Sequence, residues 1–152
     1  MPIQPDPLTA LLAERGVLLA DGATGTNLFD NAKVRQAFAR AIDKQALANK
    51  VLGGSVRPTD RILPAGLPGS ELPIKGLTFD PAAAKKLLAD AGYPKGFELD
   101  FHCTNNRLPG DSAVCEALSQ MWARAGLKIN ANALNGTVFF PAQQKGEYSM
   151  WM

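Results

Sequence analysis

The sequence predicts an α/β fold built around a strand–helix–strand unit whose two strands run parallel. Three observations in the second half of the chain support this class. Apolar and polar residues alternate over 97–103, an apolar stripe at helical spacing follows over 112–125, and a second alternation covers 127–133. The joins are short, so we expect a right-handed connection between the strands. The second strand is expected to bury Leu127, Ile129, Ala131 and Ala133 on one face.

Further elements flank this unit, each with its own end signals. Residues 7–15 predict a short helix, and 17–20 predict a strand that a glycine-rich turn follows. Four more helices are predicted: residues 34–42, a segment from the N-cap Asp43 through Val51, a segment from the N-cap Asp80 to Gly92, and a turn around Val138 that reaches Gly146. The proline-rich segment 55–79 is too apolar for a free linker, so we expect it to lie against a surface.

The end of the chain predicts a third strand over about 147–151. An apolar strand that reaches the last residue would leave an uncovered edge, so the sequence predicts an incomplete domain. The first residues have neither a basic stretch nor a long apolar stretch, which predicts that the chain as written stays in the cytoplasm.

Composition narrows the function classes. Sixteen basic and fourteen acidic residues give a net charge of +2, so nucleic acid is not an expected partner. One histidine and two cysteines are too few for an ordinary structural zinc site, and the sequence carries no nucleotide-binding or hydrolase motif. His102 is expected to be a strand histidine with a hydrogen-bond partner. We therefore expect no catalytic residue, no metal and no cofactor.

Five ordered motifs carry a family resemblance over residues 31–152. They are VRQAFARAIDK at 34–44, FDPAAAKKLLADAGYP at 79–94, GFEL at 96–99, WARAGLKI at 122–129 and GEYSM at 146–150. This region resembles the carboxy-terminal lobe of family 5 extracytoplasmic solute-binding proteins. The resemblance implies part of a periplasmic-binding-protein type II-like lobe, with no enzyme activity. It also implies a peptide or small-solute ligand, the permease subunits of an ABC importer as partners, and a periplasmic location.

The first 30 residues carry a different resemblance. LLADGATGTNLF at 18–29 resembles the first strand and turn of homocysteine S-methyltransferases, which are TIM barrels. The resemblance implies a domain boundary near residue 30, with residues 1–30 of methyltransferase type and 31–152 of solute-binding type. The alternative function is therefore a methyltransferase-related fragment. It would lack a complete active site, because that family's zinc-binding cysteines come from later strands.

Candidate ligand contacts follow the strand at 97–103, where the carboxyl end of a parallel strand meets a helix amino terminus. They are Asn105, Asn106, Arg107 and Asp111. Two alternatives stay open: Asp111 or Ser112 caps the helix, and Arg107 is simply solvated. Trp122 is expected in the core, because it lies on the apolar stripe of its helix.

The two cysteines flank the same loop. Cys103 ends the strand and Cys115 lies one turn into the next helix, so a disulfide can form in an oxidising compartment. The alternative is a pair of buried thiols. The uncovered surface of an incomplete lobe also predicts self-association.

Overall fold

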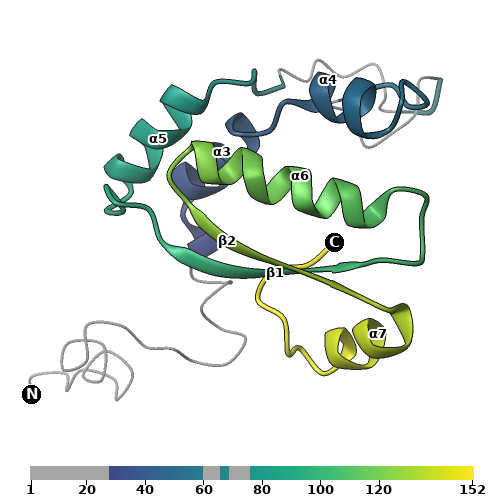
Figure 1. The fold of residues 1–152 in the computed structure, drawn as a ribbon. Helices are drawn as coiled ribbons and strands as arrows, with labels where there is room; N and C mark the ends of the chain where they lie inside the picture. The colour runs from purple at the N-terminus through teal and green to yellow at the C-terminus, as the bar shows by residue number, and fades with distance from the viewer. Residues whose placement is uncertain (1–27, 60–65, 69–75) are drawn as a thin grey trace, which may run out of the picture.

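The computed structural model describes residues 28–59, 66–68 and 76–152 (Figure 1). In chain order the elements are α3 (Ala32–Arg40), α4 (Lys44–Ala46), the π-helical turn η1 (Leu47–Val51), α5 (Pro81–Asp90), β1 (Glu98–Thr104), α6 (Asp111–Arg124), β2 (Lys128–Leu134) and α7 (Gly136–Gln144). Helices and strands alternate in the second half, which confirms the α/β class. The helix predicted at 7–15 and the strand at 17–20 lie outside the described residues. No helix that the structure describes has the length and apolar character needed to cross a bilayer.

The two strands confirm the predicted parallel unit. β1 pairs with β2 in parallel register from Glu98 opposite Lys128 to Thr104 opposite Leu134, one residue later than the sequence indicates. The helix between them, α6, covers the predicted 112–125 to within one residue at each end. The strand–helix–strand interpretation of this region is therefore correct.

The third predicted strand is wrong in extent. On the other edge of β1, the His102 N–H donates to Met150 O and the Met152 N–H donates to His102 O, each over 3.0 Å. Only Trp151 forms a bridge, with His102 and in parallel sense. Residues 146–150 are turn, irregular and bent backbone that brings the chain from the end of α7 to the β1 edge, and within this range only Met150 makes a backbone hydrogen bond to β1.

The helices that follow the two strands lie on opposite faces of the sheet (Figure 1). α6 covers the face onto which Leu99, Phe101 and Cys103 project, and all three side chains are buried. α7 lies on the other side, where Phe139 is only 1% exposed and its ring packs near those of Tyr148 and Trp151. β2 lies along one edge of β1 and the Trp151 segment lies along the other edge. The connection from β1 to β2 and the connection from β2 to Trp151 therefore run in opposite directions across the sheet, so the winding direction changes at β1.

Helix α3 joins the core through α6. The ring of Trp122 lies 5.1 Å from the rings of both Phe38 and Phe101, and it is buried as predicted. Its indole Nε1–H donates to Phe38 O over 3.1 Å. That carbonyl belongs to the last turn of α3, whose C=O groups lack intrahelical partners. Another of these carbonyls, Arg40 O, accepts from the Asp80 N–H over 2.8 Å. Hydrogen-bond donors from two distant segments therefore satisfy two carbonyl groups at the end of α3.

The predicted helix starts are confirmed at two caps. The Asp43 carboxylate accepts from Ala46 N over 2.8 Å, and the Asp80 carboxylate accepts from Ala83 N over 2.9 Å. Gly96, in the turn before β1, has φ +70°, and a Cβ there would lie 1.8 Å from the backbone oxygen of Gly126. Only glycine allows these two turns to approach so closely.

Two other expectations are met only in part. Ala131 and Ala133 are exposed, because β2 is the edge strand of the described sheet and these small side chains at its far end are left uncovered. Leu127 is buried as predicted. The His102 ring stacks on Tyr148 with centroids 3.9 Å apart, but its Nδ1 is buried without a hydrogen-bond partner among the described residues. Burial lowers the pKa of His102, and the nearby Asp100 carboxylate and a hydrogen bond to the Met150 backbone oppose that shift.

Candidate ligand-binding crevice

A crevice of about 380 Å³ opens at the carboxyl end of β1, and we call it the β1 crevice. It is lined by Leu52, Ser55, Val56, Thr104, Arg107, Leu108, Pro109, Asp111, Val114 and Met152. Open α/β sheets bind ligands where the winding direction changes, just beyond the strand ends. The β1 crevice lies at this place, and its volume falls within the roughly 300–1,000 Å³ of small-molecule sites.

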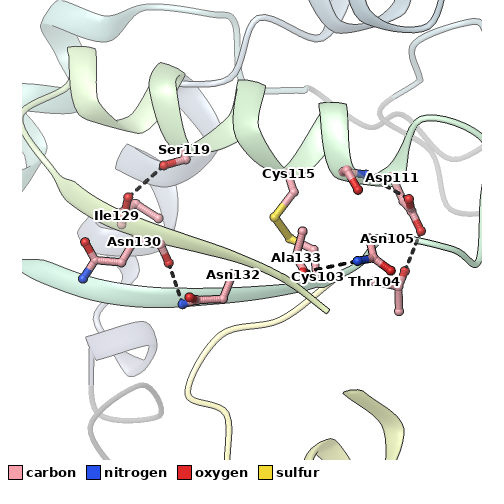
Figure 2. Close-up of a disulfide and its surroundings, with 11 residues drawn as sticks. Cys103, Thr104, Asn105, Asp111, Cys115, Ser119, Ile129, Asn130, Asn132 and Ala133 are labelled. Atoms are coloured by element: carbon pink, nitrogen blue, oxygen red, sulfur yellow. Dashed lines mark hydrogen bonds between the residues drawn. A yellow bond between two sulfur atoms is a disulfide. The ribbon is translucent and has the colours of Figure 1, made fainter. Parts of the chain in front are cut away.

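Asp111 organises the loop that forms one wall (Figure 2). Its Oδ2 accepts from Thr104 Oγ1 at 2.9 Å, from Arg107 N at 3.0 Å and from Leu108 N at 3.3 Å. Its Oδ1 accepts from Ser112 N at 2.9 Å. Burial alone would raise the pKa of Asp111, but these hydrogen bonds outweigh burial and hold it below its usual value. The carboxylate is thus ionised and already satisfied by the protein.

The two asparagines of the loop connect it to β2 and α7. The Asn105 N–H donates to Leu134 O over 2.9 Å, and its side-chain amide lies 3.4 Å from Ala133 O. Asn106 Oδ1 accepts from Gly136 N over 2.9 Å. Neither residue lines the crevice, although both side chains are exposed close to it. Their contacts hold the loop against the start of α7.

Arg107 is the cationic residue of the crevice lining. Its guanidinium carbon lies 5.5 Å from the centre of the Phe140 ring, which supports the cation from α7. No carboxylate of the described residues forms an ion pair with it. With respect to the part of the chain that the structure describes, the guanidinium donors are therefore available to an anion.

The structure brings two of the four candidate residues, Arg107 and Asp111, into the crevice lining. Sequence reasoning missed the apolar wall, which comes from Leu52 and Val56 after η1, from Leu108 in the loop, and from Met152. Leu108 could have been found, since it follows Arg107 directly. The segment after η1 has no periodic pattern that would place it beside β1. Gly110, with φ +81°, turns the chain into α6, and a Cβ there would lie 3.1 Å from Leu52 Cδ2.

Cys103 and Cys115 are bonded beneath the start of α6 (Figure 2), with Cα atoms 6.2 Å apart. Both residues are buried. The bridge encloses the loop that carries Arg107 and joins the end of β1 to α6. Among the described residues, no three His, Cys, Asp or Glu side chains gather in a way that could hold a metal ion.

A parallel sheet with helices on both faces, and with a crevice at the strand end where the winding changes, defines a ligand-binding α/β lobe. The profile of bacterial extracellular solute-binding proteins, family 5 (middle region), matches residues 17–152. The chain belongs to this family. The match begins before the boundary expected near residue 30, and that boundary remains a prediction.

Three relatives show how closely the chain resembles characterised members. It is 37% identical over 133 residues to heme-binding protein A of Haemophilus influenzae, covering 82% of this chain and 24% of that protein. It is 35% identical over 107 residues to the glutathione-binding protein GsiB of Pectobacterium atrosepticum, covering 70% and 20%. The periplasmic binding protein DppA of Helicobacter pylori, solved with the peptide STSA, superposes with a TM-score of 0.73 at 25% identity, covering 82% and 24%. The chain thus spans between a fifth and a quarter of the length of these relatives.

These comparisons confirm the expected fold of a periplasmic-binding-protein type II lobe. The relatives are solute-binding components rather than enzymes. The alternative function, a fragment related to homocysteine S-methyltransferases, receives no support from them.

Proposed function

We propose that this chain forms part of the ligand-binding lobe of a periplasmic solute-binding protein that delivers a peptide or similar small solute to an ABC importer. The β1 crevice carries the proposal. The crevice lies where the winding direction of the sheet changes. The Asp111 hydrogen bonds hold the loop that forms one wall in a fixed conformation. The lining also contains a cation, Arg107, that has no carboxylate partner among the described residues. Family membership supports the same function.

The four candidate residues take different roles in this proposal. Arg107 contacts an anionic group of the solute directly. Asp111 positions the loop, because all its described contacts are to the protein itself. Asn105 and Asn106 hold the loop against β2 and α7, and because they lie outside the crevice lining, their exposed amide groups reach only a solute that extends beyond the crevice. The permease subunits of the importer, as partners, belong to this proposal too.

Affinity should be weak for this chain alone. Small-molecule sites bury most of the ligand surface, and the β1 crevice supplies one wall of such a site. We expect a mixed library of di- to pentapeptides to give dissociation constants near the millimolar range, read from amide shifts of residues 104–112 in an isotope-labelled sample.

The variant Arg107→Gln should remove most of this binding. Arg124→Gln is a matched control, because Arg124 is exposed in the last turn of α6 and does not line the β1 crevice. Binding by no peptide at millimolar concentration, or equal binding by the two variants, would contradict the proposal.

A further inference from the structure

We propose that Asn135 is a site of spontaneous deamidation, and that the hydrogen bond between the Gly136 N–H and the Asn106 side chain sets the rate of this modification. The modification is a covalent change of the chain itself and does not depend on which solute the crevice binds. Three features where β2 meets α7 carry the proposal. They are an exposed side-chain amide, a glycine directly after it, and a backbone nitrogen held by the crevice loop, residues 105–110.

The reaction takes place between two neighbouring residues. The backbone nitrogen of Gly136 attacks the side-chain carbon Cγ of Asn135, and a bond forms between these two atoms. The bond from Cγ to Nδ2 breaks, and Nδ2 leaves as ammonia with the proton that the Gly136 nitrogen loses. Water then opens the cyclic imide at either of its carbonyl groups, which gives aspartate or isoaspartate. Water is the only co-reactant.

The Asn135 side chain is open to this attack. Asn135 is exposed, and no described residue accepts a hydrogen bond from its Nδ2, so ammonia can leave into solvent. Its Oδ1 accepts from the Thr137 N–H over 3.0 Å and from Thr137 Oγ1 over 2.9 Å. Negative charge develops on this oxygen when the nitrogen adds to Cγ. Two donors already directed at the oxygen therefore stabilise the addition.

The attacking nitrogen belongs to a glycine, which leaves it uncrowded. A Cβ at Gly136 would lie 3.2 Å from Phe140 Cε2 and 3.4 Å from Asn106 Oδ1. A larger residue at this position would therefore press against the start of α7 and restrict the rotation that brings the nitrogen to Cγ.

Asn106 restrains that nitrogen. The Gly136 N–H donates to Asn106 Oδ1 over 2.9 Å, and the two residues are 30 positions apart. An amide nitrogen attacks only after it has lost its proton, so this hydrogen bond must open before a base from solvent can reach the N–H. Hydrogen bonds at exposed helix ends open locally. The bond should slow the reaction by about twofold to tenfold, the range expected for one neutral hydrogen bond.

Two asparagines of β2 provide the contrast. Asn130 and Asn132 are each followed by an alanine. The Asn130 Nδ2 donates to the carboxylates of Glu98 and Asp100, and the Asn132 Nδ2 donates to Asn130 O. Both leaving groups are engaged, and the backbone of both residues is paired with β1. We therefore expect them to keep their amides.

The two products affect the start of α7 differently. Aspartate keeps a side-chain oxygen at the helix N-cap and adds a negative charge there, which a helix N-terminus favours. Isoaspartate carries the main chain through the former side chain, and this longer path displaces Gly136 and removes the cap on the Thr137 N–H. The bond to Asn106 is then lost. Isoaspartate formation should therefore release the crevice loop, which carries Arg107, from α7.

The first test ages the full chain in mildly alkaline buffer and maps the modification by trypsin digestion and mass spectrometry. One tryptic peptide, residues 129–145, contains Asn130, Asn132 and Asn135, so fragmentation compares all three in the same sample. We expect Asn135 to be the one that converts, at a rate that rises with pH. Conversion of Asn130 or Asn132 as fast as Asn135 would overturn the proposal. So would an intact Asn135 under conditions in which the synthetic peptide 129–145 deamidates.

Three variants test the assigned roles. Asn135→Ser keeps a capping oxygen but has no amide, so conversion at this position should be lost. Asn106→Ala should accelerate conversion by about twofold to tenfold. Asn132→Ala is the matched control and should leave the rate unchanged, because the Asn132 side chain contacts the Asn130 backbone rather than Gly136. A rate in Asn106→Ala equal to or below that of the parent would overturn the proposal, as would an equal acceleration at Asn130, which would indicate general unfolding.

The second test examines the crevice loop in the modified protein. The aspartate and isoaspartate forms of isotope-labelled chain are separated by reversed-phase chromatography and refolded, and their amide spectra are compared with the parent. We expect the amides of residues 105–110 to shift in the isoaspartate form and to stay near their parent positions in the aspartate form. Unchanged amides in the isoaspartate form would contradict the coupling between Asn106 and the start of α7.

Discussion

Replacing Trp122 with phenylalanine should destabilise the protein through one specific hydrogen bond as well as through packing. The Trp122 Nε1–H donates to Phe38 O in the last turn of α3, 84 residues away in sequence. Phenylalanine keeps an aromatic ring among Phe38 and Phe101 but has no donor. The Phe38 carbonyl would then be left without its partner in the core.

The expected magnitude follows from the two losses. A buried carbonyl without a hydrogen bond costs about 1–3 kcal/mol. Removing three ring atoms from a packed aromatic cluster adds about 1–2 kcal/mol. We therefore expect the free energy of unfolding to fall by about 3 kcal/mol, a large part of the stability of a domain of this size.

Urea unfolding, followed by far-ultraviolet circular dichroism, measures this change. With a denaturant dependence of about 1–3 kcal/mol per molar urea, the midpoint should move down by about 1–3 M. Trp151→Phe is the matched control, because Trp151 is 51% exposed and should change stability by less than about 0.5 kcal/mol. Equal midpoints for the two variants would refute the argument that Trp122 closes the end of α3.

Three further predictions address the loop, the bridge and the sheet edge. The pKa of the Asp111 carboxyl is lower in the folded state than in the unfolded state, so its ionised form stabilises the fold above the unfolded pKa, and this stabilisation disappears as pH falls through the folded pKa. Asp111→Asn should therefore flatten the acid side of the curve of unfolding free energy against pH. An unchanged curve would contradict the assigned hydrogen bonds. Reducing the bond between Cys103 and Cys115 should lower the free energy of unfolding by about 3 kcal/mol in urea titrations with and without reductant, and two alkylated thiols in unreduced protein from an oxidising compartment would rule the bridge out. Ala131→Lys should leave the free energy of unfolding within about 0.5 kcal/mol of the parent value, because Ala131 is exposed. Ala84→Lys, at a fully buried position of α5, should unfold the protein or lower its melting temperature strongly. If Ala131→Lys lowered the melting temperature as much as Ala84→Lys, β2 would have to be covered.

The sequence predicted the elements whose signals are local. Asp80 followed by proline marks the start of α5, and the alternation over 97–103 marks β1, because caps and side-chain periodicity depend only on neighbouring residues. The parallel pairing followed from the short joins around α6. These features required no knowledge of distant contacts.

The sequence did not predict features that depend on distant segments. The alternation over 127–133 predicts one buried face, but burial of Ala131 depends on whether another element covers the strand edge. In the same way, Arg107 and Asp111 could be placed at a strand end, whereas Leu52 and Val56 joined the crevice only through the path of the chain after η1. A sequence pattern shows which face of a helix or strand is apolar, and it does not show which distant segment packs against that face.

The sequence separations of the stabilising contacts imply an order of folding. Lys128 and Glu98 are 30 residues apart, and the two cysteines are 12 apart, so β1, α6 and β2 form a compact unit from nearby parts of the chain. The contact between Trp122 and α3 spans 84 residues. Short loops close more readily, so we expect this unit to provide the folding nucleus and α3 to dock after the rate-limiting step. Weakening the Trp122 contact would then accelerate unfolding and leave the folding rate nearly unchanged.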